Sequence, residues 1–145
     1  MRKIKIIAVC LVLLLSCKNK IETADTLTNK DIKRIQKLHL LDNGETIYKF
    51  YSEFRKSVAG SFYTNKRMAN YWLDDDSKSN TKINSAYYKD IIKIDTVHFA
   101  GSTYCPYLLV TKKDSSSFKV YVEGSRDEVK EFFTDALTIW EKEKN

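Results

Sequence analysis

The sequence predicts an α+β domain in which about seven short antiparallel strands are followed by one amphipathic helix. Segments of strand length within residues 45–122 are rich in aromatic and β-branched residues, and turn residues separate them. Residues 126–144 instead place apolar side chains three and four positions apart, which is the spacing of a helix face. A bent antiparallel sheet or partly open barrel with the helix at its open end fits this order, and so does a two-layer α+β sandwich.

A short helix is expected before the strands, over residues 31–41. Ile32, Ile35 and Leu38 stand at helical spacing in this segment. The residues 42–44, Asp-Asn-Gly, then supply a stop signal.

Seven segments have the length and composition of strands. They cover residues 47–51, 61–64, 67–73, 82–88, 91–99, 107–111 and 118–122. Asn65 and Lys66 form an expected tight reversal, because Asn tolerates the left-handed backbone region. The polar residues 74–80 predict a longer loop, and residues 100–102 predict another turn.

The last hairpin shows which of its faces is buried. In its second strand Phe118, Val120 and Val122 alternate with Lys119 and Tyr121. Because neighbouring side chains of a strand point to opposite faces, the three apolar residues are expected to face the core.

The C-terminal helix is the clearest single element. Ser125 and Glu128 have the spacing of a capping box, and Lys142 suits the negative end of the helix. One face of the helix is apolar and comprises Val129, Phe132, Phe133, Ala136, Leu137 and Trp140. This face must lie on an apolar surface, which the sheet would provide.

Three segments carry a family resemblance. Residues 62–69 resemble the hairpin of bacterial pleckstrin-homology-like and GRAM-like domains, in which an apolar strand runs into Thr-(Asp or Asn)-x-Arg. Residues 87–94 are similar to a later segment of those domains, and residues 44–48 resemble their first strand with its leading Glu. The resemblance implies a pleckstrin-homology-like (PH-like) domain over residues 31–145.

The same resemblance implies a basic ligand site. It would place Arg55 and Lys56 at a hairpin end that neighbours Lys66 and Arg67. Cations in such a pocket bind the phosphates of lipid headgroups.

The N-terminus predicts export and lipid attachment. A basic start precedes an apolar run at residues 6–15, which is the order of a secretory signal peptide and is too short to span a bilayer. Residues 14–17, Leu-Leu-Ser-Cys, resemble the lipobox of bacterial lipoproteins. This implies cleavage before Cys17, acylation of Cys17, and a place in the bacterial cell envelope, in the outer membrane if the cell has one. An ordinary secretory signal is the alternative.

These boundaries divide the chain into three parts. Residues 1–16 are the signal peptide, residues 17–30 are expected to be a polar tether reaching roughly 20 Å, and residues 31–145 form the domain. Removing 16 of the 145 residues leaves 129, and the loss of three positive side chains lowers the net charge from +6 to +3. A mildly basic domain without a basic stripe gives no case for nucleic-acid binding.

Little in the sequence indicates catalysis or a cofactor. Cys105 is the one cysteine left after acylation, so no internal disulfide is expected. His39 and His98 are far apart in the sequence, and neither a metal site nor a cofactor is predicted. We therefore expect a non-enzymatic binding or scaffolding domain that engages a protein or an envelope lipid.

Two alternatives remain at this point. One is a thiol-dependent envelope hydrolase in which Cys105 is the nucleophile and His98 and Asp95 assist it. The other is an inhibitor or immunity-type lipoprotein. The many tyrosines and Trp72 either form a protein-binding face or fill the core of a small barrel.

Overall fold

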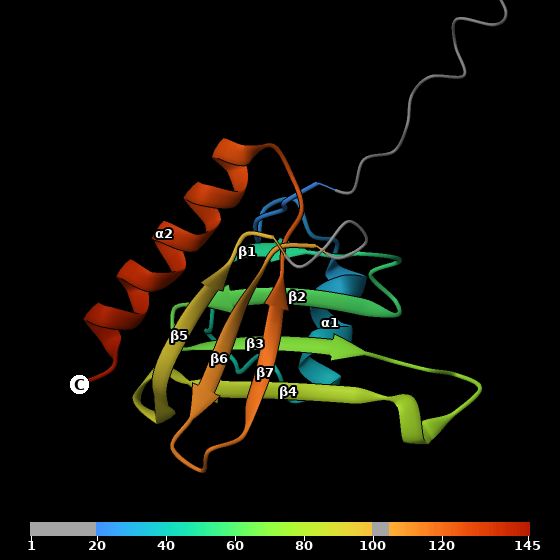
Figure 1. The fold of residues 1–145 in the computed structure, drawn as a ribbon. Coiled ribbons are helices and arrows are strands. Elements are labelled where there is room, and N and C mark those ends of the chain that lie inside the picture. The colour runs from blue at the N-terminus through green and yellow to red at the C-terminus, as the bar shows by residue number, and fades with distance from the viewer. Residues whose placement is uncertain (1–19, 100–104) are drawn as a thin grey trace, which may run out of the picture.

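Two antiparallel sheets and two helices make up the described part of the molecule (Figure 1). The computed structural model describes residues 20–99 and 105–145. The elements are α1 (Asn29–Lys37), β1 (Ile47–Tyr51), β2 (Ala59–Thr64), β3 (Arg67–Trp72), β4 (Lys82–Tyr87), β5 (Ile91–Val97), β6 (Tyr107–Lys112), β7 (Ser117–Tyr121) and α2 (Arg126–Glu143). Short 3-10 turns lie at Lys78–Asn80 and Tyr88–Asp90.

The strands are paired in chain order. Sheet A has the order β1-β2-β3-β4 and sheet B the order β5-β6-β7, and all pairs are antiparallel. The two sheets cross, with β7 packed against β2 and β3 (Figure 1). The predicted α+β class, its seven strands and its C-terminal helix are confirmed, and the described strands form two open sheets rather than a closed barrel.

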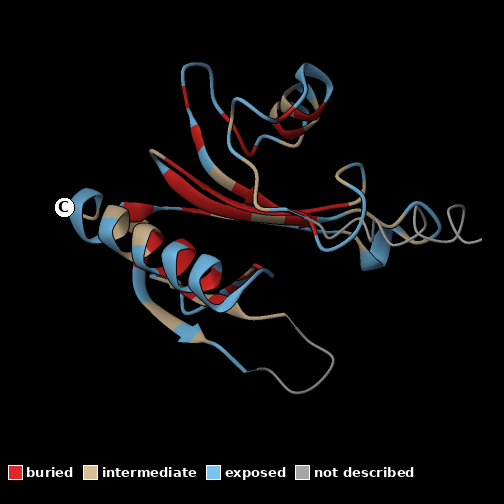
Figure 2. Cartoon of the chain, turned by 90° about the horizontal axis from the view of Figure 1, so that it is seen from above, coloured by how far each residue is buried: buried red, intermediate tan, exposed pale blue. Residues whose placement is uncertain are grey.

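Helix α2 closes one open side between the sheets. Its capping box forms as predicted, because the Ser125 hydroxyl accepts the Glu128 N–H and the Glu128 carboxylate accepts the Ser125 N–H. Val129, Phe132 and Phe133 are buried on its inner face. The red inner stripe and pale outer stripe of α2 in Figure 2 show this two-sided character.

The main core lies between sheet A, sheet B and α2. Its fully buried side chains include two aromatic residues of sheet A, aliphatic residues of sheet B and Phe132 of α2. They are Tyr51, Tyr63, Leu108, Val110, Val120 and Phe132. As expected, Phe118, Val120 and Val122 face this core.

The opposite face of sheet A is covered by a second apolar layer. The residues before β1, which we call the N-terminal layer, cover this face. Sheet A is thus enclosed between α1 on one side and sheet B with α2 on the other (Figure 2). Ile35 and Leu40 are buried there against Phe50 and Phe62. Helix α1 begins at Asn29 with Thr28 as its cap and ends at Lys37, four residues before the predicted end.

This second layer corrects the predicted tether. Within the expected tether of residues 17–30, the described part from Ile21 onward belongs to the fold. Glu22 and Phe50 exchange two backbone hydrogen bonds of 2.7 and 2.8 Å, and Leu27 is buried. Ile21 and Leu27 are isolated apolar residues in a polar segment, and both find apolar surface on the sheets. Residues 17–19, like Cys17 itself, lie outside the described residues.

None of the helices in the described ranges has the length and apolar composition to span a membrane.

Candidate functional site

The structure separates the four cations of the predicted headgroup pocket. Arg55 and Lys56 lie in the β1–β2 connection, whereas Lys66 and Arg67 lie at the β2–β3 turn. Successive turns of an antiparallel sheet fall at opposite ends, so the length of β2, roughly 20 Å, separates the two pairs. The expectation that these hairpin ends are neighbours is wrong, and no single pocket joins the four residues.

Arg67 is a buried structural residue. Its side chain is 3% exposed and donates to both carboxylate oxygens of Glu45, at 3.0 and 2.8 Å. It also pairs with Asp42 at 2.6 Å and lies over the Tyr87 ring. Burial opposes the charge of Arg67, but Glu45 and Asp42 outweigh burial and raise its pKa above the ordinary value.

The Thr-Asn-x-Arg hairpin motif therefore has a structural explanation. The Thr64 hydroxyl donates to Glu45 and accepts the backbone N–H groups of Lys66 and Arg67. Thr64 and Arg67 thus bind the Glu that leads into β1. The family resemblance included Glu45, Thr64 and Arg67. Their pairing could not be predicted from it, because it joins segments about twenty residues apart in the sequence.

The other three cations also have different surroundings. Lys56 pairs with Glu22 at 2.9 Å and Asp31 at 3.4 Å, and so fastens the N-terminal layer to the β1–β2 connection. Arg55 is exposed and stacks on the neighbouring Phe54 ring. Lys66 is exposed at the far end of the sheet.

Cys105 lies beside the Glu123 carboxylate and the Tyr51 hydroxyl. Its Sγ is 3.8 Å from Glu123 Oε2, which also accepts the Tyr51 hydroxyl at 3.0 Å. Burial and the Glu123 charge raise the pKa of the thiol, which disfavours the thiolate that a nucleophile requires.

The two residues proposed to assist Cys105 have other contacts. The His98 ring packs on Phe133 of α2, with 5.0 Å between centroids, and Asp95 pairs with Lys93. Among the contacts of the described residues, the three side chains do not form a catalytic arrangement. No group of three or more possible metal ligands gathers in residues 20–99 and 105–145.

The aromatic residues divide between core and surface. Tyr51, Tyr63, Tyr71 and Tyr88 are buried. Tyr48, Trp72 and Tyr87 are exposed, Tyr107 and Tyr121 are half-buried, and Tyr104 lies outside the described residues. Some aromatic residues thus fill the core and others lie on the surface, and a protein-binding role of the exposed ones stays a prediction.

One groove brings exposed aromatic and polar side chains together, and we call it the inter-sheet groove. It forms because sheet A extends beyond sheet B, which leaves the end of β3 and the start of β4 uncovered beside β7 (Figure 1). The groove holds about 670 Å³, a volume typical of ligand sites. It is lined by Glu53, Asn70, Trp72, Thr81, Lys82, Ile83, Asn84, Ser117, Phe118, Lys119 and Tyr121.

The groove combines an aromatic surface, amides and two cations. Trp72 is 38% exposed. Asn84 donates to Asn70 across the sheet at 2.9 Å. Lys119 lies over the Tyr107 ring, and neither Lys82 nor Lys119 has an ion pair among the described residues.

Glu53 adds one acidic group to this surface. The surrounding protein partly desolvates its carboxyl and raises its pKa. No sequence pattern indicated the groove, because its two walls come from β3–β4 and from β7, which the chain brings together only on folding.

Two crossed antiparallel sheets with a C-terminal helix along their open side define the PH-like class of fold. The chain is similar to the crystal structure of a DUF1696 family protein with a pleckstrin-homology domain from Shewanella loihica PV-4. The TM-score is 0.55 at 12% identity, over 88% of this chain and 98% of that chain. At this identity the similarity shows the fold alone, and it confirms the PH-like fold that the hairpin motif predicted.

No family model matches the sequence, and no curated protein matches it.

Proposed function

We propose that this protein is a lipid-anchored, non-enzymatic binding domain of the bacterial envelope, and that it holds an extended segment of a partner protein in the inter-sheet groove. The anchoring rests on the lipobox resemblance at residues 14–17. The binding role rests on one observation, which is that exposed Trp72 lies beside the open edge of β7.

The edge of β7 borders the groove along its length. Ser117, Phe118 and Lys119 are consecutive and all line the groove, although neighbouring side chains of a strand point to opposite faces. The edge of the strand therefore faces the groove. Within residues 20–99 and 105–145, β7 is the last strand of sheet B, so no described strand pairs with the outer edge of residues 117–119. An extended peptide satisfies such groups by adding a strand.

The side chains of the groove define what the segment carries. Trp72 offers a flat apolar surface, and Trp is among the residues that contribute most to protein interfaces. Lys82 and Lys119 offer positive charges that form no ion pair among the described residues, although Lys119 lies over the Tyr107 ring. The segment is therefore expected to present an apolar or aromatic residue together with acidic residues.

Site-specific photocrosslinking in living cells tests the groove. A photoreactive amino acid at Lys119 is expected to yield a discrete adduct with one envelope protein. The same amino acid at Lys66 is the control and is expected to yield none, because Lys66 is exposed at the β2–β3 turn, at the opposite end of β2 from the groove. Identical adducts from both positions, or adducts from Lys66 alone, would rule out the groove as the binding site.

Binding to the crosslinked partner then tests the role of Trp72. Trp72→Ala is expected to weaken the complex by ~2 kcal/mol, a roughly 30-fold rise in Kd. Tyr48→Ala removes an aromatic side chain of similar exposure outside the groove and is expected to leave Kd unchanged. Equal effects of the two variants would contradict a specific role for the groove.

Mass spectrometry of the native protein tests the anchor. The expected N-terminal species is Cys17 carrying acyl chains, and Cys17→Ser is expected to accumulate as an uncut precursor. A native protein with an intact Met1 or an unmodified Cys17 would refute the lipoprotein assignment.

A further inference from the structure

The distance between the acylation site and the folded domain limits how the domain can stand on a membrane. Ile21 packs on the main core, and Glu22 is bonded to Phe50 of β1. Four peptide units join Cys17 to Ile21. Whatever conformation they adopt, they span at most about 14 Å.

This reach is short in relation to the domain. A domain of this size has a radius of gyration of about 14 Å and is therefore roughly 35 Å across. A domain attached so closely cannot present its far side to the bilayer. The end from which Lys20 emerges must stay near the headgroups.

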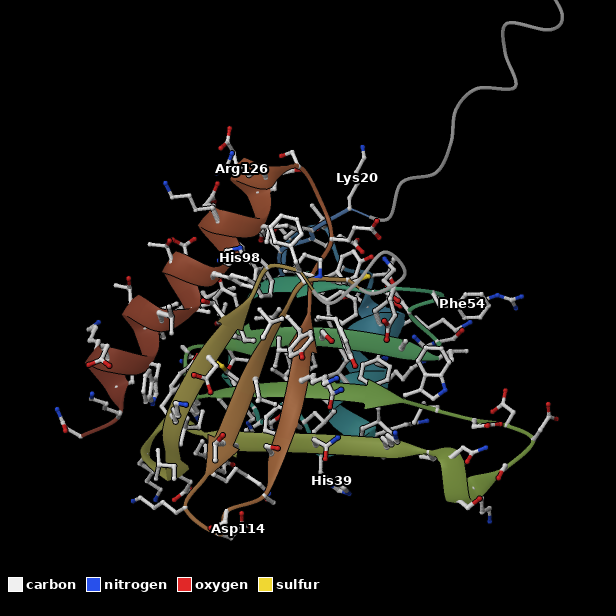
Figure 3. The ribbon with its side chains drawn as sticks, in the orientation of Figure 1. Lys20, His39, Phe54, His98, Asp114 and Arg126 are labelled. Atoms are coloured by element: carbon white, nitrogen blue, oxygen red, sulfur yellow. The ribbon has the colours of Figure 1, made fainter. Side chains whose placement is uncertain are left out.

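The residues of that end can be identified in the structure. Figure 3 shows Lys20 and Arg126 at one end of the molecule, and His39 and Asp114 at the opposite end. Arg126 lines a surface cleft together with Phe99 and Lys130. Phe99 is 95% exposed, which is unusual for a large apolar side chain.

We propose that the end bearing Lys20, Phe99, Arg126 and Lys130 rests on the lipid bilayer. The proposal depends on the acylation of Cys17 put forward above. Phe99 lies among the headgroups, where aromatic side chains are enriched in membrane proteins. The three cations contact lipid phosphates. Asp127 lines the same cleft, so the short connection and Phe99 determine the orientation more than net charge does.

This orientation leaves the inter-sheet groove free for a partner. β1 is the strand of sheet A nearest the bilayer, since Glu22 pairs with it. Strands lie about 4.8 Å apart, so β4 stands about 14 Å farther from the membrane than β1. The groove, built on β3, β4 and β7, therefore faces the aqueous space.

Spin-label relaxation on vesicles tests the orientation. The acylated protein with Cys105→Ser is reconstituted into phosphatidylethanolamine–phosphatidylglycerol vesicles that carry a nickel-chelating lipid. A nitroxide is attached at Asp127→Cys in one sample and at Asp114→Cys in the other. Relaxation enhancement at position 127 is expected to exceed that at position 114 at least threefold. Equal enhancement at both positions would overturn the proposal.

Two further variants separate the causes of the orientation. A twenty-residue Gly-Ser spacer inserted after Asn19 gives the connection a root-mean-square length of about 25 Å and a much longer maximum span. It is expected to reduce the difference in relaxation enhancement between the two labels. Phe99→Ser with Arg126→Glu, at the original length, is expected to reduce it as well. An unchanged difference with the spacer would refute the role of the short connection, and an unchanged difference with the second variant would refute the surface contact.

A flotation assay distinguishes this proposal from the proposed anchor. Protein that does not float with the vesicles shows that the anchor has failed. Protein that floats with equal enhancement at positions 114 and 127 shows that the anchor holds and the orientation is wrong.

Discussion

Sheet A and sheet B differ in how many of their faces are covered. All six residues of β2 in sheet A are buried, whereas in β7 of sheet B buried and exposed residues alternate up to the half-buried Tyr121. A side chain at Gly60 of β2 would lie within 2.5 Å of Tyr71 and 2.7 Å of Phe50, so the packing on the α1 side is close. Sheet A is stabilised by two apolar layers and sheet B by one. Changes in sheet A are therefore expected to be the more costly.

The largest effect is expected where a charge is buried beside sheet A. Glu45→Ala removes the main partner of Arg67 and leaves a guanidinium that is 3% exposed, with the half-exposed Asp42 as its remaining ion-pair partner. We expect the free energy of unfolding to fall by about 4 kcal/mol, because the desolvation of Arg67 is no longer compensated. Urea unfolding at neutral pH measures this loss.

Two controls accompany that change. Asp95→Ala breaks the exposed pair with Lys93 on sheet B and is expected to cost less than about 0.5 kcal/mol. Glu45→Met with Arg67→Leu replaces the buried pair by apolar side chains and is expected to recover most of the stability. Equal losses from Glu45→Ala and Asp95→Ala would contradict the contrast between the sheets.

A smaller effect is expected from the N-terminal layer. Ile35 of α1 is fully buried against sheet A, whereas Ile92 of β5 is 56% exposed. Ile35→Ala is expected to cost about 3 kcal/mol through the cavity it leaves, and Ile92→Ala less than about 0.5 kcal/mol. Thermal unfolding compares the two. If Ile35→Ala also costs less than about 0.5 kcal/mol, α1 does not stabilise sheet A.

The cap of α1 adds a dependence on pH. Burial opposes ionisation of Asp31, but hydrogen bonds from Thr28 and the charges of Lys56 and Arg34 outweigh it and hold the pKa of Asp31 below its usual value. A carboxyl with a lowered folded pKa stabilises the protein above its unfolded pKa of about 3.9, and loses this contribution as the pH falls through the folded value.

Asp31→Asn therefore tests the direction of this pH dependence of stability. At pH 7 it is expected to destabilise by about 1 kcal/mol, because it weakens the capping box that Asp31 forms with Thr28. The difference from the wild type should shrink below pH 4, where Asp31 itself becomes protonated. Urea unfolding at the two pH values measures it, and a difference that grows on acidification would show that the direction is wrong.

The smallest effect concerns two buried tyrosines of the main core. The Tyr88 hydroxyl donates to the Thr64 carbonyl, while the Tyr63 hydroxyl is buried without a hydrogen-bond partner among the described residues. Tyr88→Phe is expected to destabilise by about 1 kcal/mol, and Tyr63→Phe to be neutral or stabilising by up to about 1 kcal/mol. Thermal unfolding compares them. A loss at Tyr63 as large as that at Tyr88 would reveal a partner for its hydroxyl.

Local patterns predicted most of the secondary structure. The alternation at residues 118–122 identified the buried face of β7, and the spacing of Ser125 and Glu128 identified the start of α2. Both depend on interactions within a few residues. The turn at Asn65 and Lys66 was found for the same reason.

The helix of the N-terminal layer was predicted, but the part of the layer before it was missed because apolar residues are sparse there. This part has only Ile21 and Leu27 as large apolar residues among polar ones, and this composition resembles that of a tether. Leu27 is buried only because sheet A offers a second apolar face, whereas Ile21 packs on the main core. In residues 59–64 aromatic side chains occupy neighbouring positions and so point to both faces of the sheet. This was a signal of the second covered face, because a strand covered on one face alternates between apolar and polar residues.

The candidate site was predictable only in part. The resemblance indicated a PH-like domain, but it placed the ligand cations in one pocket although consecutive turns of a sheet point to opposite ends. The chain order alone would have separated Arg55 from Lys66. The inter-sheet groove depends on how far sheet A extends past β7, and no local pattern encodes that length.

The pairing of Glu22 with Phe50 also protects the molecule against self-association. β1 is an edge strand, and these two hydrogen bonds occupy its outer side at Phe50. A shortened protein that starts at Asp31 would lose Glu22 and the cover of Leu27, and would expose an aromatic edge to which a second copy can add its own strand. The segment that precedes α1 thus also keeps the edge of β1 from pairing with a second copy.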